Sequence, residues 1–138
     1  FMCRARNIKP ENIEEKNVFD LPLNRYAETY STGMKKKLAL TAILLQNNNV
    51  FILDEPYNGV DIQSNILISE IILKLKSLNK TVILSSHIFS TLSDTCSQIF
   101  LLKKGEFSNP ILKHEYADLE ESMKEETVLK RLDKLGLE

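Results

Sequence analysis

Residues 50–56 have the sequence VFILDEP, and this stretch decides the fold. Its first four residues form a continuous apolar run rich in β-branched and aromatic side chains, which predicts a buried strand of a parallel sheet. The run ends at two adjacent carboxylates, Asp54 and Glu55. Ligands of open parallel sheets bind at the carboxyl ends of the strands. The stretch therefore predicts a central strand, followed by either a functional site or a solvated acidic turn.

Helices and strands alternate on both sides of this stretch. The predicted elements are a helix at 31–46, the strand at 50–53, a helix at 62–78, a strand at 81–84, a short helix at 88–96 and a strand at 98–103. The first helix is apolar almost all round, which predicts burial on most sides. The second has an apolar stripe at Leu67, Ile71, Leu75 and Leu78. This order predicts an α/β fold with a mostly parallel sheet and flanking helices.

Length, charge and cysteine content exclude several classes of protein. The 138 residues carry 18 Lys+Arg and 19 Asp+Glu, a formal net charge of −1, whereas a general nucleic-acid-binding protein needs a basic face. Cys3 and Cys96 form no CxxC pair and no Cys/His cluster, which argues against a zinc site or a disulfide framework. The longest nearly apolar stretch, 38–45, is far shorter than the roughly 20 residues that cross a bilayer.

The start of the helix at 31–46 has an unusual composition. Ser31 is a typical N-cap residue, but Gly33 lies in the first turn, where glycine lowers helix stability. The following Lys35, Lys36 and Lys37 oppose the helix macrodipole. These residues suit a bound anion at the helix N-terminus, and they equally suit a capped helix with a solvated lysine face.

Two more polar residues follow the predicted strands. His87 comes just after the strand at 81–84, so it also lies at a carboxyl end, where it could contact a phosphate or position a carboxylate. A single histidine at such a place also commonly has only a structural role. Asp61 precedes the helix at 62–78 and is a candidate N-cap.

Four short segments occur together in an order and spacing that resembles the C-terminal half of an ABC-type ATPase domain. They are Tyr30–Met34, Asp54–Pro56, Asn58–Asp61 and Ser85–His87. The resemblance runs from about residue 21 to residue 107 and includes the strand and Lys-Lys-Gly-Glu turn at 98–106. It implies a partial P-loop NTPase fold of the ABC type, with part of the helical signature subdomain.

The resemblance assigns two of the segments to contacts between subunits. Tyr30–Met34 is similar to the signature motif, in which Ser31, Thr32, Gly33 and Met34 would contact the γ-phosphate of ATP bound to the opposite subunit. Thr32 and Met34 depart from the usual Gly and Gln. The segment ending at Asp61 resembles the D-loop, which crosses the dimer interface.

The other two segments resemble the catalytic parts of the family. Asp54 matches the Walker B aspartate, which holds Mg²⁺ through water. Glu55 matches the residue that polarises the hydrolytic water, and His87 matches the switch histidine that senses the γ-phosphate. Tyr57 stands where Thr is common. These parts fit phosphoryl transfer, in which positioning and charge stabilisation supply most of the catalysis.

One part of the family pattern is missing. A P-loop requires G-x-x-x-x-G-K-[ST], and no glycine in this sequence is followed by lysine. We therefore expect that the chain, which starts at Phe1, lacks the N-terminal half of its domain and does not hydrolyse ATP alone. The expected organisation is a partial signature subdomain at 1–46, half of the ATPase core at 47–110 and a surface helix within 111–138.

The resemblance implies the nucleotide-binding subunit of an ABC transporter that uses ATP and Mg²⁺. Its expected partners are a second ATP-binding subunit in a head-to-tail dimer and an integral membrane permease, with no nucleic acid. The expected location is cytoplasmic, peripheral at the inner face of the cell membrane. The alternatives are a soluble ABC-type ATPase, such as a translation factor or a chromosome ATPase, and a non-enzymatic module that completes a partner's site.

Overall fold

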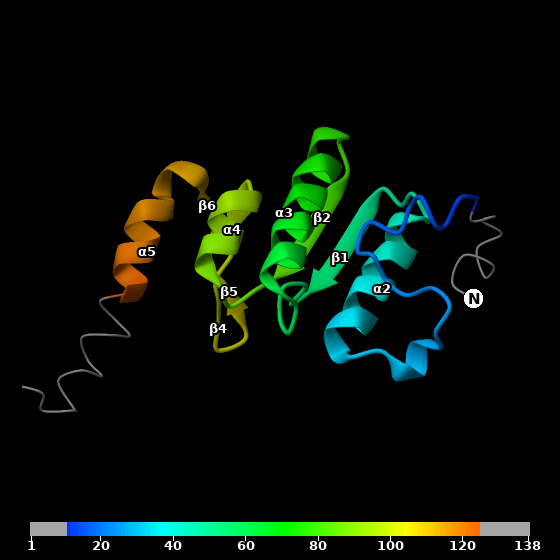
Figure 1. Ribbon diagram of the computed structural model, residues 1–138. Helices are drawn as coiled ribbons and strands as arrows, with labels where there is room; N and C mark the ends of the chain where they lie inside the picture. The colour runs from blue at the N-terminus through cyan, green and yellow to red at the C-terminus, as the bar shows by residue number, and fades with distance from the viewer. Residues whose placement is uncertain (1–10, 125–138) are drawn as a thin grey trace, which may run out of the picture. The chain divides into compact units, whose positions relative to one another are not determined.

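A computed structural model describes residues 11–124, which form two compact units with a boundary between His87 and Ile88 (Figure 1). The first unit contains the elements that surround the VFILDEP stretch. In chain order these are a short 3-10 helix (Ala27–Thr29), α2 (Thr32–Leu44), β1 (Val50–Asp54), α3 (Ile62–Ser77) and β2 (Thr81–Ser85). The predicted helix–strand–helix–strand order of this unit is confirmed.

Strands β1 and β2 pair in parallel, from Val50 opposite Thr81 to Asp54 opposite Ser85. The two strands have the same length, so they end side by side. Within the described residues only one face of this sheet is covered: Phe51 and Leu53 are buried, whereas Ile52 and Ile83 are exposed. Within this part of the chain the strand predicted at 50–53 is therefore buried on one face, and its other face is exposed.

The core of the first unit lies between α2, α3 and the covered face of the sheet. Leu40 of α2, Leu53 of β1 and Ile68 and Ile72 of α3 belong to one buried cluster, together with Tyr57 from the loop after β1. In α3 the predicted stripe is therefore shifted by one position, although Leu67, Ile71 and Leu75 still border the core or lie in it. Leu78 is exposed.

Helix α2 begins where the sequence predicts and is less enclosed than expected. Only Leu40 and Thr41 are fully buried, while Ala39 is exposed and most other apolar side chains are half-buried. The apolar surface of this helix exceeds what the described residues cover. No helix among residues 11–124 is both long and apolar enough to cross a membrane.

The second unit consists of short elements. They are α4 (Phe89–Thr95), β3 (Gln98–Ile99), β4 (Leu102–Lys103), β5 (Glu106–Phe107), β6 (Ile111–Leu112), a 3-10 helix (Lys113–Glu115) and α5 (Tyr116–Lys124). The strand predicted at 98–103 is two short strands: β3 pairs antiparallel with β6, and β4 forms a hairpin with β5. Lys104 and Gly105 both have positive φ, 53° and 86°, as a tight two-residue hairpin turn requires.

Within the segment 111–138, where the sequence predicts a surface helix, α5 covers Tyr116–Lys124. It contains an i,i+4 ion pair, with Lys124 Nζ at 2.8 Å from Glu120 Oε1. The rest of that segment, 125–138, lies outside the described residues.

The core of α3 gives a direct test of the fold. Ile68 is 2% exposed and Ile66, on the same helix, is 61% exposed. We expect Ile68→Ala to lower the free energy of unfolding by about 2–5 kcal/mol, because it opens a cavity in the packed cluster. The matched change Ile66→Ala is expected to stay within about 0.5 kcal/mol of wild type. Urea unfolding measures both, and equal losses would contradict this core.

Candidate active site

The parallel register brings Asp54 and Ser85 together at the carboxyl end of the sheet. They are the last paired residues of β1 and β2, and Ser85 Oγ donates a hydrogen bond to Asp54 Oδ1 at 2.5 Å. The Asp54 side chain remains exposed to solvent. One oxygen of the carboxylate is thus held by the protein at the edge where a ligand of a parallel sheet would bind.

Glu55 lies in a strained turn directly after β1. Its φ is 46°, in the left-handed region that L-residues other than Asn, Asp and Gly avoid. Four hydrogen bonds hold its backbone. Its amide donates to Ser85 O at 3.2 Å and Ser85 Oγ at 3.1 Å, and its carbonyl accepts from the Asn58 amide at 3.2 Å and from Lys36 Nζ at 3.1 Å. Strained residues held in this way cluster at functional sites. The chain turns at Glu55 and does not continue in the direction of β1.

The side chain of Glu55 contacts His87. His87 Nδ1 lies 3.0 Å from both Glu55 Oε1 and Oε2. The Glu55 side chain is 31% exposed and the His87 side chain is 67% exposed. Because an ionised carboxylate only accepts hydrogen bonds, we assign the proton to Nδ1 in this contact. His87 Nε2 is then free to contact a further group. The two residues singled out from separate strand ends are therefore brought together.

The N-terminus of α2 forms a second group with the loop before α3. Ser31 Oγ accepts a hydrogen bond from the Met34 amide at 3.2 Å, which confirms the N-cap. A Cβ at Gly33 would lie 2.6 Å from Gly59 O, so this position requires glycine for close approach of two backbone segments. Thr32 is exposed, whereas Met34 packs partly against the core.

Asp61 has the expected cap role and an additional ion pair. Its Oδ1 accepts from the Ser64 amide at 2.9 Å, and its Oδ2 accepts from Lys37 Nζ at 2.5 Å. The Lys37 side chain is 14% exposed and that of Asp61 56% exposed. The hydrogen bond from Lys37 and those from Ser64 hold the pKa of Asp61 well below its usual value.

Two of the three lysines after Ser31 have partners inside the protein. Lys37 pairs with Asp61, and Lys36 Nζ donates to Glu55 O at 3.1 Å and to Asn58 O at 2.7 Å. The interpretation that these lysines form a local anion site is therefore wrong for Lys36 and Lys37. Lys36 donates hydrogen bonds to backbone carbonyls, and Lys37 forms an ion pair with a carboxylate. Of the three lysines only Lys35 is exposed.

Three residues of this region have contacts that the sequence did not predict. Ser85 contacts both acidic residues. An in-register parallel pairing of the two predicted strands places it opposite Asp54, and this signal could have found it. Lys36 crosses from α2 to the turn after β1, which no local pattern indicates. Tyr57, noted as a departure from the family, is 2% exposed in the core, and its hydroxyl accepts from Ser69 Oγ at 3.3 Å.

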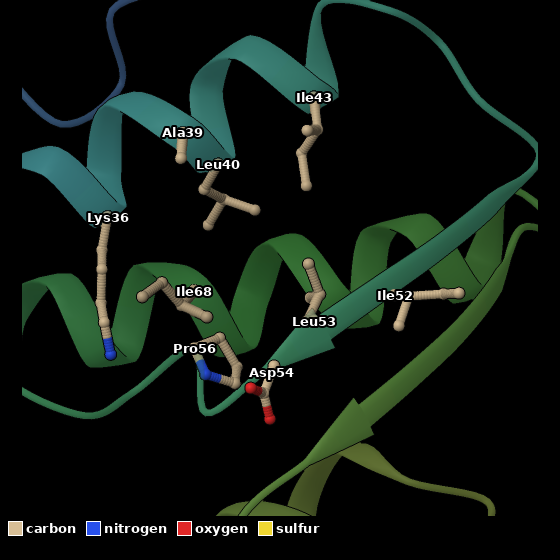
Figure 2. A pocket seen from close by; sticks show the side chains of 9 residues that line it. All are labelled: Lys36, Ala39, Leu40, Ile43, Ile52, Leu53, Asp54, Pro56 and Ile68. Atoms are coloured by element: carbon tan, nitrogen blue, oxygen red, sulfur yellow. The ribbon is translucent and has the colours of Figure 1, made fainter.

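A small cavity lies beside this region. Figure 2 shows side chains of α2 facing β1 and α3 across it. Its volume is about 200 Å³, and its lining is Lys36, Ala39, Leu40, Ile43, Ile52, Leu53, Asp54, Pro56 and Ile68. Most of these residues are apolar, so the cavity does not suit phosphate groups.

The Lys37–Asp61 pair predicts a pH-dependent contribution to stability. Asp61→Asn retains a good N-cap residue and removes the ionic contact. Because the folded pKa of Asp61 lies below its ordinary value of 3.8, the stabilisation is complete above that pH and is lost as the pH falls below it. At neutral pH we expect the urea concentration at the unfolding midpoint to be higher for wild type than for Asp61→Asn. This difference in midpoint should become smaller as the pH falls below 3.8. A gap independent of pH would contradict this assignment.

The close approach of Gly33 to Gly59 predicts a steric effect. Alanine is a better helix former than glycine by about 1 kcal/mol, yet we expect Gly33→Ala to lower the melting temperature, because its Cβ would collide with a backbone carbonyl. The neighbouring exposed change Thr32→Ala serves as the control and is expected to leave it nearly unchanged. Thermal unfolding measures both, and a more stable Gly33→Ala chain would refute the contact.

Comparison with known protein families gives one match over most of the chain. Residues 8–94 match the family described as "AAA domain, putative AbiEii toxin, Type IV TA system". Similar curated proteins include the ABC transporter ATP-binding protein NatA of Bacillus subtilis, 33% identical over 61% of this chain and 34% of that protein. The uncharacterized ABC transporter ATP-binding protein YhcH of Bacillus subtilis is 43% identical over 56% of this chain and 26% of that protein. The chain spans about a third or less of these relatives.

Solved structures show the same fold. The ATP-binding subunit of an ABC transporter matches 88% of this chain and 52% of its own, with a TM-score of 0.68 and 21% identity. A dimeric ATP-binding cassette in a post-hydrolysis state with ADP and Pi matches 65% of this chain and 39% of its own, with a TM-score of 0.60 and 21% identity. The predicted partial P-loop NTPase fold of the ABC type is confirmed. The chain belongs to the AAA-domain family of the matching model, and its relatives and fold identify it as part of an ABC-type ATPase nucleotide-binding domain.

Proposed function

We propose that this chain contributes the hydrolytic residues of the ATP-binding subunit of an ABC transporter. The observation that carries the proposal is the Glu55–His87 contact at 3.0 Å, beside Asp54 at the carboxyl end of the sheet. Two carboxylates and a histidine at this edge suit a reaction in which water attacks a phosphoryl group. The names of the curated relatives support the transporter assignment.

Asp54 fits a role in holding Mg²⁺. Among the described residues no cluster of three or more His, Cys, Asp or Glu side chains could hold a metal ion by itself. Mg²⁺ in nucleotide sites is commonly held by one or two carboxylates, waters and substrate phosphates, and Asp54 is an exposed carboxylate with one oxygen already oriented by Ser85. Bound with ATP, the ion would neutralise charge on the phosphates.

Glu55 and His87 act on the attacking water in this proposal. The Glu55 carboxylate accepts a hydrogen bond from the water and increases its nucleophilicity. His87 holds that carboxylate through Nδ1. Its Nε2 would contact the phosphate. The Glu55 carboxylate is held beside His87 by the Nδ1 contact, and a preorganised carboxylate needs little reorganisation during the reaction.

The second group of residues faces a different ATP molecule. The proposed contacts to the γ-phosphate bound by the opposite subunit come from Ser31, Thr32, Gly33 and Met34 at the N-terminus of α2, because helix N-termini attract anions. Asp61 lies beside this group through Lys37 and would reach the dimer interface. A second ATP-binding subunit is therefore the proposed partner, in line with the dimeric assembly of the similar cassette.

The proposed parent protein contains a P-loop outside these 138 residues. The partial signature subdomain at 1–46, the half core at 47–110 and the terminal helix within 111–138 remain the proposed division of this chain. In the parent, ATP binding would close the dimer and hydrolysis would reopen it, which would drive a membrane permease from the inner face of the membrane. The proposed partners do not include nucleic acid.

A soluble ABC-type ATPase is the second candidate. A chain in a model of ribosome-bound archaeal Pelota and ABCE1 has a similar fold, with a TM-score of 0.68 and 23% identity. The match covers 79% of this chain and 19% of the chain in that assembly. A second ABC domain in the parent sequence would favour this candidate, whereas a neighbouring permease would favour the transporter. A parent without any P-loop would favour a non-enzymatic module that completes a partner's site.

The catalytic assignment predicts the result of replacing Glu55. In the parent ATPase we expect Glu55→Gln to lower the turnover number at least about 100-fold and to retain ATP binding, because the amide keeps the shape and loses the basic oxygen. Glu70→Gln, an exposed change on α3, is the control and is expected to behave as wild type. Phosphate release and nucleotide binding measure the two properties.

The same assay tests the requirement for a P-loop. The isolated 138-residue chain is expected to show no ATP turnover above that of its Glu55→Gln variant. Turnover by the isolated chain that depends on Glu55 would overturn this part of the proposal. Full activity of the Glu55→Gln parent would overturn the catalytic assignment itself.

A further inference from the structure

Lys36 connects the N-terminal end of α2 to the catalytic turn. Its Nζ lies 3.1 Å from Glu55 O and 2.7 Å from Asn58 O, the two carbonyls at the ends of one turn. The Asn58 amide donates to Glu55 O at 3.2 Å and closes that turn. One ammonium group therefore holds both ends of the segment that carries Glu55.

The turn needs such a hold, because Glu55 has a φ of 46°. The left-handed conformation is unfavourable for an L-residue of this kind, and it persists only where the surroundings over-determine it. Ser85 holds the amide side of Glu55, and Lys36 holds the carbonyl side. From this backbone geometry the Glu55 carboxylate lies 3.0 Å from His87 Nδ1.

The position of Lys36 in α2 distinguishes it from the two neighbouring lysines. It lies three residues after Gly33, where an added Cβ would lie 2.6 Å from Gly59 O, so the same helix end lies close to the loop on both sides of Asn58. Lys35 is adjacent in sequence but exposed, and Lys37 pairs with Asp61. Of these three lysines, only Lys36 contacts the turn of the catalytic glutamate.

We propose that Lys36 is a positioning residue for Glu55, which couples the α2 N-terminus to the hydrolytic carboxylate of the same subunit. This inference rests on the proposed function. It adds a link between the two ATP sites of the dimer: the α2 N-terminus faces the partner's ATP, and Glu55 faces the subunit's own. A shift of α2 on binding the partner's ATP would pass through Lys36 to the Glu55 turn.

The test compares Lys36→Met with Lys35→Met in the parent ATPase. We expect Lys36→Met to lower kcat roughly 10- to 100-fold, since a displacement of about 1 Å at a catalytic group has that effect. KM for ATP is expected to stay within about twofold, because binding groups are untouched. Lys36→Arg should restore most of the lost turnover, and Lys35→Met should match wild type.

Two further measurements separate positioning from general damage. In a Glu55→Gln background, adding Lys36→Met should cause no further loss, because Lys36 acts through Glu55. Hydrogen exchange of the Asn58 amide should become faster in Lys36→Met and remain unchanged in Lys35→Met. If Lys36→Met does not fold, as judged by circular dichroism, Lys36→Gln takes its place in every measurement.

The inference is overturned if the Lys36 variants turn over ATP as wild type does, if they raise KM with kcat unchanged, or if the loss in the Glu55→Gln background equals that in wild type. These results leave the proposed function intact, because wild type would still hydrolyse ATP and Glu55→Gln would not. A wild-type parent without ATP turnover would instead refute the proposed function and this inference with it.

Discussion

The parallel pairing of β1 with β2 is the constraint on which the candidate site depends. It sets Asp54 opposite Ser85, so that one hydroxyl contacts the Asp54 carboxylate and the Glu55 amide. Glu55 and His87 follow the two strand ends and meet beyond them. A register shift of one residue would move Asp54 away from Ser85 and turn the apolar side chains of β1 off the core. Fold and site therefore share one hydrogen-bond ladder.

A second level of order comes from helix α2. Its apolar side packs on Leu53 and Ile68, and its polar first turns reach the loop between β1 and α3 through Gly33, Lys36 and Lys37. The charges on this helix satisfy carbonyls and one carboxylate, so they stabilise loop geometry. These contacts offset the unfavourable interaction of Lys36 and Lys37 with the helix macrodipole.

Much of the fold was predictable, since its signals are local. The apolar run before Asp54, the caps at Ser31 and Asp61 and the turn at Gly105 each follow from side-chain chemistry over a few residues. Burial was predicted less well: α2 and the outer face of the sheet are more exposed than their composition indicates. Apolar content shows that a surface favours burial, and it does not show which segments cover it.

The sequence by itself determined the alternating α/β order, the acidic strand end and the set of residues that resembles the family motifs, because these depend on residue type and spacing. Only the tertiary structure decided that Glu55 and His87 touch, that Ser85 holds Asp54, and that Lys36 holds the Glu55 turn. Each of these contacts joins residues 19 or more positions apart. Their geometry is set by strand register and helix packing, which no local sequence signal specifies.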